Sequence, residues 1–415
     1  MTDTSRAHAE ALDAADPLAP FRDRFVLGDG LVYLDGNSLG RLPASTPERL
    51  RRAAAEEWGH GLIRSWTEWV TLSREVGDLI GTQLLGARPG EVVISDSTTV
   101  NLYKLAAAAL DARPDRRVLV TDEDNFPTDL YVFQGLARQR GLELRIVPTD
   151  VDTGLDPDVL RRALGADVAL VSLSHVAYRS GALADMTAVT RMAHDAGALV
   201  LWDLSHSAGS VPVPLTASGA DLAVGCTYKY LNGGPGAPAF LYVRSGLQAQ
   251  LRQPIWGWFG QEDQFAMGPE YDPVEGIERF CAGTPPVLAT YAVAEGAGIV
   301  AEAGIGALRA KAVAMTSYLV ELADAVLDGF TVASPRDPAR RGAHVSLHHP
   351  EAWQLCQALV DRGVVPDFRT PDRLRLGPAP LYTRYTDVWD GVDALRQLAE
   401  TGAHRAYPAE RARVT

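Results

Sequence analysis

Between residues 91 and 243 the sequence alternates short apolar runs, rich in β-branched residues, with longer helical patterns. We expect seven strands, at Val92–Ser95, Val118–Thr121, Leu144–Val147, Val168–Leu173, Leu199–Asp203, Leu222–Thr227 and Ala239–Val243. Helical patterns lie between most of them, as at Val100–Leu110 and Ala188–Ala196. Strands that alternate with helices are typical of a largely parallel sheet covered by helices. The sequence therefore predicts an α/β fold.

Polar residues follow five of these runs. Ligands of open α/β sheets bind beyond the carboxyl ends of the strands. The polar segments are Asp96–Thr99, Asp124–Asp129, Ser174–His175, Asp203–His206 and Thr227–Lys229. We expect them to meet at one edge of the sheet and to form a ligand site there.

Lys229 ends one apolar run and precedes a glycine-rich turn. A partly desolvated lysine can form an imine with a carbonyl cofactor. Asp203, at the end of the preceding run, can keep the nitrogen of a pyridine ring protonated, as a pyridine-based aldehyde cofactor requires. Taken singly, Lys229 also fits a surface loop, and Asp203 also fits a helix N-cap.

The remaining parts of such a cofactor site occur on the same strand ends. Thr98 and Thr99 lie at a strand-to-helix junction, where free N–H groups favour an anion. Phe126 can stack on a pyridine ring, His206 can hydrogen-bond the nearby aspartate, and Tyr228 places a phenol beside the lysine. Each also has a structural interpretation as a cap, a core residue or a buried histidine. Because all parts occur together in a workable order, the cofactor site is favoured.

Composition limits the partners. The net charge of −13 argues against nucleic acid. Three scattered cysteines favour a reducing compartment, with neither a disulfide framework nor a metal cluster. The first residues lack the pattern of a signal peptide, and no apolar run is long enough to cross a bilayer. We therefore expect a cytoplasmic protein with a small-molecule substrate, no bound metal and no membrane partner.

The 415 residues suggest more than one lobe. We expect an N-terminal arm and helix at 1–70 that pack with the small domain. A large cofactor-binding domain at 71–295 and a small α+β domain at 296–415 follow. Within the first part, His60 and Trp66 lie outside any clean helical period and either line an aromatic pocket or pack an interface.

Several segments resemble the kynureninase family, a group of pyridoxal phosphate enzymes of fold type I (aspartate-aminotransferase-like). The landmarks are Leu34–Gly40, Thr99–Leu102, Phe126–Asp129, Asp203–His206, Tyr228–Asn232, Gly257–Gly260 and Pro378–Tyr382. The resemblance runs from about Leu31 to Tyr385. It implies a large domain with a mixed, mostly parallel seven-stranded sheet and a smaller α+β domain.

The resemblance also implies an activity: hydrolysis of L-kynurenine, and of its 3-hydroxy form, at the Cβ–Cγ bond. The products are L-alanine and anthranilate or 3-hydroxyanthranilate. The preference between the two substrates stays open, as does the choice between tryptophan catabolism and the supply of an anthranilate for biosynthesis. The group that activates the water is not identified by the sequence.

Residue roles follow from the resemblance position by position. The catalytic residues are Lys229, Tyr228 and Asp203. The other cofactor-binding residues are Thr98, Thr99, Phe126, Asp129, Ser174, His206, Trp258 and Thr284. The substrate-binding residues are Arg375, Asn37, Ser38, His60 and Trp66. Because Trp258 and Thr284 fall where the family completes the phosphate site of the partner subunit, a homodimer with shared active sites is implied. Thr284 stands where many members carry Asn.

Two alternatives remain at this point. Another fold type I enzyme, a class V aminotransferase or a cysteine desulfurase, has the same cofactor parts. A desulfurase needs a nucleophilic cysteine, and Cys281 is the only candidate, without a supporting motif. A non-catalytic relative is the other alternative, but it has no need of Lys229, Asp203 and Arg375 together.

Overall fold

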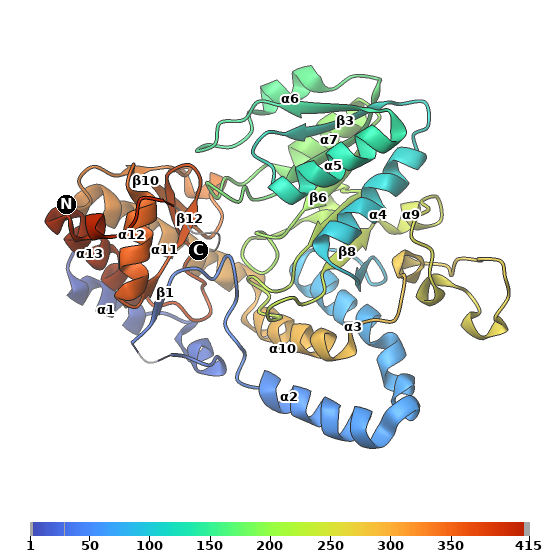
Figure 1. Cartoon of the computed structure of the whole chain (residues 1–415), viewed down its shortest axis with the longest axis horizontal. Helices are drawn as coiled ribbons and strands as arrows, with labels where there is room; N and C mark the ends of the chain where they lie inside the picture. Colours follow the sequence, from blue (N-terminus) through green and yellow to red (C-terminus); the bar gives the residue numbers. More distant parts are fainter. Residues whose placement is uncertain (1–2, 29, 411–415) are drawn as a thin grey trace.

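A computed structural model describes residues 3–28 and 30–410, and the chain forms two lobes (Figure 1). The large lobe contains a seven-stranded sheet of order β2-β8-β7-β6-β5-β3-β4. Its strands are β2 (Val92–Ile94), β3 (Val118–Asp122), β4 (Glu143–Val147), β5 (Val168–Ser174), β6 (Leu199–Asp203), β7 (Leu222–Gly225) and β8 (Phe240–Val243). Strand β8 runs antiparallel to both of its neighbours, β2 and β7, and the other neighbouring strands pair in parallel. All seven predicted strands and the mixed, mostly parallel sheet are confirmed.

Helices cover both faces of this sheet (Figure 1), so its central strands are buried over almost their whole length. The helices of the large lobe are α3 (Trp66–Leu84), α4 (Thr98–Asp111), α5 (Pro127–Arg140), α6 (Pro157–Ala163), α7 (Met186–Asp195), α8 (Leu215–Ser218), α9 (Ser245–Gln248) and α10 (Val287–Ala303). Four buried alanines, Ala106–Ala109, let α4 approach the sheet closely. This approach brings the first turn of α4 to the carboxyl edge of the strands.

The small lobe contains a four-stranded antiparallel sheet of order β12-β13-β10-β9. Its strands are β9 (Thr331–Val332), β10 (Val345–His348), β12 (Asp367–Arg369) and β13 (Arg373–Leu376), and its helices are α11 (Ile305–Val326), α12 (Ala352–Asp361) and α13 (Tyr385–Thr401). Alternation along β13 puts Leu374 and Leu376 into the apolar core. Arg373 and Arg375 consequently lie on the opposite face of the sheet.

The N-terminal segment belongs to both lobes. Helix α1 (Arg6–Ala14) packs on α13, and β1 (Val32–Tyr33) pairs in parallel with β11 (Val364–Val365). The chain then crosses to the large lobe, where α2 (Thr46–Arg52) packs on α10. Helix α2 then continues as a π-helical segment, η2 (Ala53–Gly61). Such segments are rare and occur often at functional sites.

Among the described residues, no single helix is long and apolar enough to span a membrane. Helices α10 and α11 together pass that test of length and composition, but they are bent by 81° at their junction.

Candidate active site

A cavity of about 240 Å³ lies at the carboxyl edge of the large sheet. Nine of the residues singled out in the sequence line it: Thr98, Thr99, Phe126, Asp129, Ser174, Asp203, His206, Tyr228 and Lys229. They come from the ends of β3, β5, β6 and β7 and from the first turns of α4 and α5. The expected convergence of polar strand ends is confirmed.

Lys229 is held by a tight turn. Asn232 N–H donates to the Lys229 carbonyl (2.9 Å), and Gly233 N–H donates to the Thr227 carbonyl (2.9 Å). The N-terminal arm supports this turn from outside, because Gly40 N–H donates to the Tyr228 carbonyl (2.8 Å). A Cβ on Gly40 would lie 2.3 Å from the Lys229 carbonyl oxygen, so this close approach requires glycine.

The amine of Lys229 lies between two aromatic rings. Its Nζ is 5.9 Å from the ring centroids of both Phe126 and Tyr228, and 3.2 Å from Nε2 of His206. Burial, followed by the charge of Lys229, holds the pKa of His206 well below its usual value. His206 is therefore a neutral imidazole that can accept a hydrogen bond. Its nitrogens contact the lysine, whereas the sequence suggested the carboxylate of Asp203 as its partner.

Two buried carboxyl groups, those of Asp203 and Asp129, line the same cavity as the lysine. Asp203 accepts a hydrogen bond from Ser205 N–H (2.7 Å), and Oδ2 of Asp129 has no hydrogen-bond partner within the described residues. Burial and the Asp203 carboxylate raise the pKa of Asp129 well above its usual value, and Lys229 opposes that rise. A protonated ring nitrogen in this cavity would supply the positive charge and the N–H donor that these groups lack.

The first turn of α4 forms an anion site. Ser97 caps the helix by accepting from Val100 N–H (3.3 Å). Thr98 and Thr99 lie in the first turn of the helix, where no preceding turn supplies a carbonyl to accept from their N–H groups. These N–H groups can therefore bind a phosphate. Asp96 does not oppose this site, because it forms an ion pair with the fully buried Lys104 (2.7 Å).

Arg375 is the centre of a second group of predicted residues. Its guanidinium is buried and donates to Ser38 Oγ (2.7 Å) and to the carbonyl of Tyr178 (2.6 Å). With its amide oxygen turned to the guanidinium, Asn37 accepts from Nε (2.8 Å) and from a terminal nitrogen (3.0 Å). Asp367 balances the charge at 2.5 Å. Arg375, Asn37 and Ser38 thus meet, as the sequence predicted.

Seven predicted residues do not line this cavity: the three of the Arg375 group and four others, which are His60, Trp66, Trp258 and Thr284. His60 lies exposed on η2, and Trp66 packs against Trp69 and Phe259 (centroids 5.5 and 5.8 Å apart). Trp258 is half exposed, with its indole N–H donating to the carbonyl of Gln264 (2.7 Å). Within one chain, these three side chains lie apart from the cofactor cavity.

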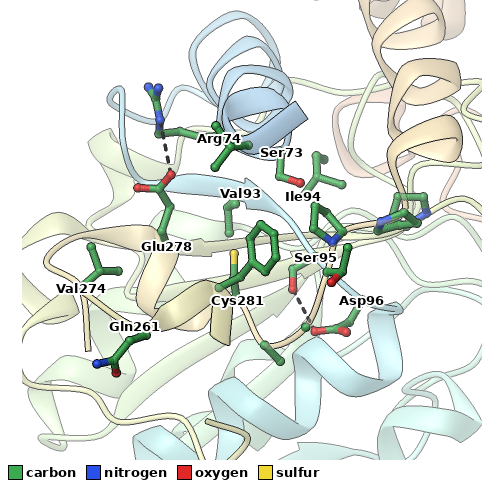
Figure 2. A pocket seen from close by; sticks show the side chains of 18 of the residues that line it. Ser73, Arg74, Val93, Ile94, Ser95, Asp96, Gln261, Val274, Glu278 and Cys281 are labelled. Carbon is green, nitrogen blue, oxygen red and sulfur yellow. Dashed lines mark hydrogen bonds and ion pairs between the residues drawn. The ribbon is translucent and has the colours of Figure 1, made fainter. Parts of the chain in front are cut away.

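The fourth of these residues, Thr284, lines a neighbouring cavity of about 620 Å³ (Figure 2). Figure 2 shows the Arg74–Glu278 ion pair (3.6 Å) at one end of this cavity, and Asp96 with its hydrogen bond from Ser95 at the other. The two cavities share Ser97, Gly236 and Ala237, so the larger one adjoins the anion site.

Tyr178 is a cavity residue that the sequence did not indicate. It lies four residues beyond the end of β5, outside the strand-end segments, and no composition signal marks it. Its contacts in the folded protein identify it: the Tyr178 ring packs on Phe126, and the Tyr178 carbonyl accepts a hydrogen bond from Arg375.

A lysine beside buried carboxylates, an aromatic face and a helix N-terminus meet at one sheet edge, an arrangement typical of pyridoxal phosphate-dependent enzymes of fold type I, the class to which this chain belongs. Solved structures agree with the fold. The cysteine desulfurase of Thermococcus onnurineus NA1 superposes with a TM-score of 0.81 at 20% identity, over 92% of this chain and 98% of that one. A cysteine desulfurase from Escherichia coli gives 0.79 at 20% identity, with the same coverage.

Sequence relatives narrow the class. A kynureninase from Pseudomonas fluorescens is 47% identical over 407 residues, 96% of each chain. A kynureninase from Burkholderia pseudomallei is 46% identical over 422 residues, 99% of this chain and 100% of that protein. The family model of the kynureninase C-terminal domain matches residues 308–395. The chain belongs to the kynureninase family.

The chemistry of Cys281 argues against the desulfurase alternative. Burial raises the pKa of its thiol to about 12, so the thiol stays protonated near neutral pH. A nucleophilic cysteine must be a thiolate. The likeness to desulfurases is therefore one of fold.

Proposed function

We propose that this chain is an active kynureninase, which hydrolyses L-kynurenine to anthranilate and L-alanine with bound pyridoxal phosphate. The observation that carries the proposal is the single cavity in which Lys229, Asp203 and the first turn of α4 meet, in a chain that is 47% identical to a kynureninase. We include 3-hydroxy-L-kynurenine as a second substrate, since the two differ by one hydroxyl group.

The residues of the cavity fit the cofactor. Lys229 would hold it covalently, the N–H groups of Thr98 and Thr99 would bind its phosphate, and Asp203 would keep its ring nitrogen protonated. Bound pyridoxal phosphate supplies an electron sink that stabilises negative charge at the substrate carbons next to it. The unpartnered Oδ2 of Asp129 supports this fit, because it leaves an acceptor in the cavity without a donor.

Lys229 and Tyr228 would handle protons. Once the substrate amine takes its place, the amine of Lys229 is free to remove the proton from the α-carbon, with the neutral His206 beside it to accept a hydrogen bond. The pKa of Tyr228 is raised by the nearby Cys226 and by burial. Tyr228 therefore remains a protonated phenol, as a proton donor to the β-carbon must be after water has attacked the γ-carbonyl.

Arg375 would bind the α-carboxylate of the substrate. Its planar fork suits a carboxylate, and the contacts with Asn37, Ser38 and the Tyr178 carbonyl fix its orientation. Asp367 balances the charge of this buried arginine where no substrate carboxylate is present.

We also propose a homodimer in which Trp258 and Thr284 complete the phosphate site of the partner subunit, and His60 and Trp66 the aryl end of the pocket. Exposed apolar side chains on η2, on η3 (Leu62–Ser65) and on the loop after Gly260 support an interface there: Trp58, Leu62, Ile63, Phe265 and Met267. Mixing inactive Lys229→Ala and Trp258→Ala chains tests this. Mixed dimers would contain one intact site and recover activity, whereas no recovery would contradict shared sites.

Two further assignments belong to this proposal. The large cofactor domain would span 71–295 and the small domain 296–415, with 1–70 as an arm, and the division is supported by the two separate sheets. A cytoplasmic location is supported by the three free cysteines, Cys226, Cys281 and Cys356.

The central test is direct. The purified protein should be yellow and should release fluorescent anthranilate from L-kynurenine, and borohydride should attach the cofactor to Lys229. The Lys229→Ala variant should lose both properties. A colourless wild-type protein in saturating pyridoxal phosphate would end the proposal.

If His60 contacts the 3-hydroxyl group, His60→Ala should change the ratio of kcat/KM for the two substrates, and an unchanged ratio would exclude that contact.

A further inference from the structure

A short hairpin, residues 175–184, follows β5 and joins the two lobes. Val176 and Leu183 form an antiparallel bridge, and Ala177 N–H donates to the Ala182 carbonyl (2.9 Å). Gly181 N–H closes the tip by donating to the Ala177 carbonyl (2.9 Å). We refer to this segment as the β5 hairpin.

Each of the four successive carbonyls at the tip of the β5 hairpin accepts a hydrogen bond from the small lobe. The Tyr178 carbonyl accepts from Arg375 (2.6 Å), that of Arg179 from Ser346 Oγ, that of Ser180 from Ser334 Oγ (2.5 Å) and that of Gly181 from Gly342 N–H (2.7 Å). The tip is therefore bound to the small lobe along its whole length, although it is part of the large lobe.

The side chain of Tyr178 points the other way, into the cofactor cavity. Its ring meets Phe126 edge to face, with centroids 5.3 Å apart and planes at 89°. The guanidinium of Arg179 lies over the ring at 5.1 Å and is itself tied to Asp124. The tyrosine ring is thus held from two sides, and only 6% of the residue is exposed.

We propose that Tyr178 is a positioning residue that fixes the distance between the substrate-binding arginine and the cofactor. Its carbonyl holds Arg375, and its ring holds Phe126 over the cavity. The inference rests on the proposed roles of Arg375 and Phe126. A reaction that needs the α-carboxylate and the cofactor ring in one arrangement is sensitive to displacements of about 1 Å. Tyr178 contacts both Arg375 and Phe126, the residues proposed to hold these two groups, and would therefore control that arrangement.

The backbone and side-chain contacts of Tyr178 can be separated by substitution. Tyr178→Ala removes the ring and leaves the carbonyl that holds Arg375. Tyr178→Phe removes only the hydroxyl group. We expect Tyr178→Ala to weaken binding of pyridoxal phosphate by the apoenzyme about tenfold, from the loss of an aromatic pair and its buried area, and Tyr178→Phe to bind within about twofold of wild type. Tyr131→Ala, at an exposed site on α5, is the matched control.

A double-mutant cycle tests whether Tyr178 acts through Phe126. If it does, Tyr178→Ala adds little to the loss of cofactor affinity caused by Phe126→Ala. Fully additive losses would overturn the proposal, as would a Tyr178→Phe variant as weak as Tyr178→Ala. If Tyr178→Ala does not fold, as judged by thermal unfolding of the apoenzyme, Tyr178→Leu replaces it with the same expected outcomes.

Because the test measures binding of the cofactor, the role of Tyr178 and the proposed activity can be refuted independently of each other. A wild-type protein that binds pyridoxal phosphate but does not cleave L-kynurenine would refute the activity and leave the test of Tyr178 intact. An active wild type whose Tyr178→Ala variant has unchanged cofactor affinity and unchanged KM would refute the role of Tyr178 alone.

Discussion

The two sheets of this protein carry opposite charges where the lobes meet. The large sheet ends in carboxyl groups, with Asp122, Asp124 and Asp203 at or just beyond its strand ends. The polar face of the small sheet carries arginines, of which Arg373 and Arg375 lie on β13. A substrate that contains both an amine and a carboxylate needs both kinds of surface.

The difference lies in how each charge is balanced. On the small sheet, Asp367 pairs with both Arg375 and Arg369 (2.5 and 2.8 Å), and Asp152 pairs with Arg373 (2.7 Å). At the large sheet edge, burial comes first among the causes that raise the pKa of Asp122 to about 7 and that of Asp124 to about 6. Arg375 is thus paired within the small lobe, whereas Arg373 takes its partner from the large lobe. At the large sheet edge Asp124 pairs with Arg179, and Asp122 is buried beside Asp124, whose charge further raises its pKa.

The largest loss of activity is expected from a substitution among the carboxyl groups at the edge of the large sheet. Asp203→Asn removes the negative charge that would keep the cofactor ring cationic, so kcat for L-kynurenine should fall by about 100- to 1000-fold, the usual cost of losing one preorganised electrostatic contact. Steady-state kinetics would measure it. A variant with kcat within tenfold of wild type would show that Asp203 does not stabilise charge during the reaction.

Substitution of the arginine on the small sheet should change mainly KM. Arg375→Lys keeps the charge but loses the planar fork that contacts Asn37, Ser38 and the Tyr178 carbonyl. KM for L-kynurenine should rise about 30-fold, the cost of one or two charged hydrogen bonds, with a smaller change in kcat. Arg373→Lys, two residues away and paired with Asp152, is the matched control. Equal effects of both variants would contradict a specific carboxylate site.

The smallest effect concerns stability. The carboxyl group of Asp122 has a pKa of about 7 in the folded protein, against about 4 in an unfolded chain, so its ionisation destabilises the fold as pH rises between these values. Asp122→Asn should therefore raise the free energy of unfolding by about 2 kcal/mol at pH 8, and the gain should shrink towards pH 4. Urea unfolding at several pH values measures this.

Asp195→Asn, at an exposed site on α7, is the control for this stability change. A gain for Asp122→Asn that does not vary with pH would refute the electrostatic explanation.

The sequence predicted the large sheet and the nine cavity residues because both depend on local signals. Apolar runs define strands, and the carboxyl ends of parallel strands share one edge. The ion pair between Asp96 and Lys104 was not predicted, since Asp96 looked like another polar strand end and Lys104 like an ordinary helix residue. A charge balanced by a neighbour in space leaves no periodic signal in the sequence.

The β5 hairpin was missed for a related reason. Its carbonyls bond to Ser334, Gly342, Ser346 and Arg375, more than 150 positions further along the chain. Backbone acceptors have no residue preference, so nothing in the segment marks them. His60, Trp66, Trp258 and Thr284 lie outside the cofactor cavity of the chain, and the proposed homodimer is the arrangement that would give them their predicted roles.

The N-terminal arm makes its contacts with a segment that is synthesised much later, and this affects how the enzyme can fold during synthesis. Residues 32–40 leave the ribosome early, yet the Leu34 carbonyl accepts from Gly377 N–H (2.6 Å) and Gly36 N–H donates to the Gly377 carbonyl (3.1 Å). Gly40, in the same arm, supports the turn that holds Lys229. Domains that fold during synthesis can do so only from residues already made. The large sheet can therefore assemble on the nascent chain, while the arm that supports the Lys229 turn gains its contacts with Gly377 only after that later residue has been made.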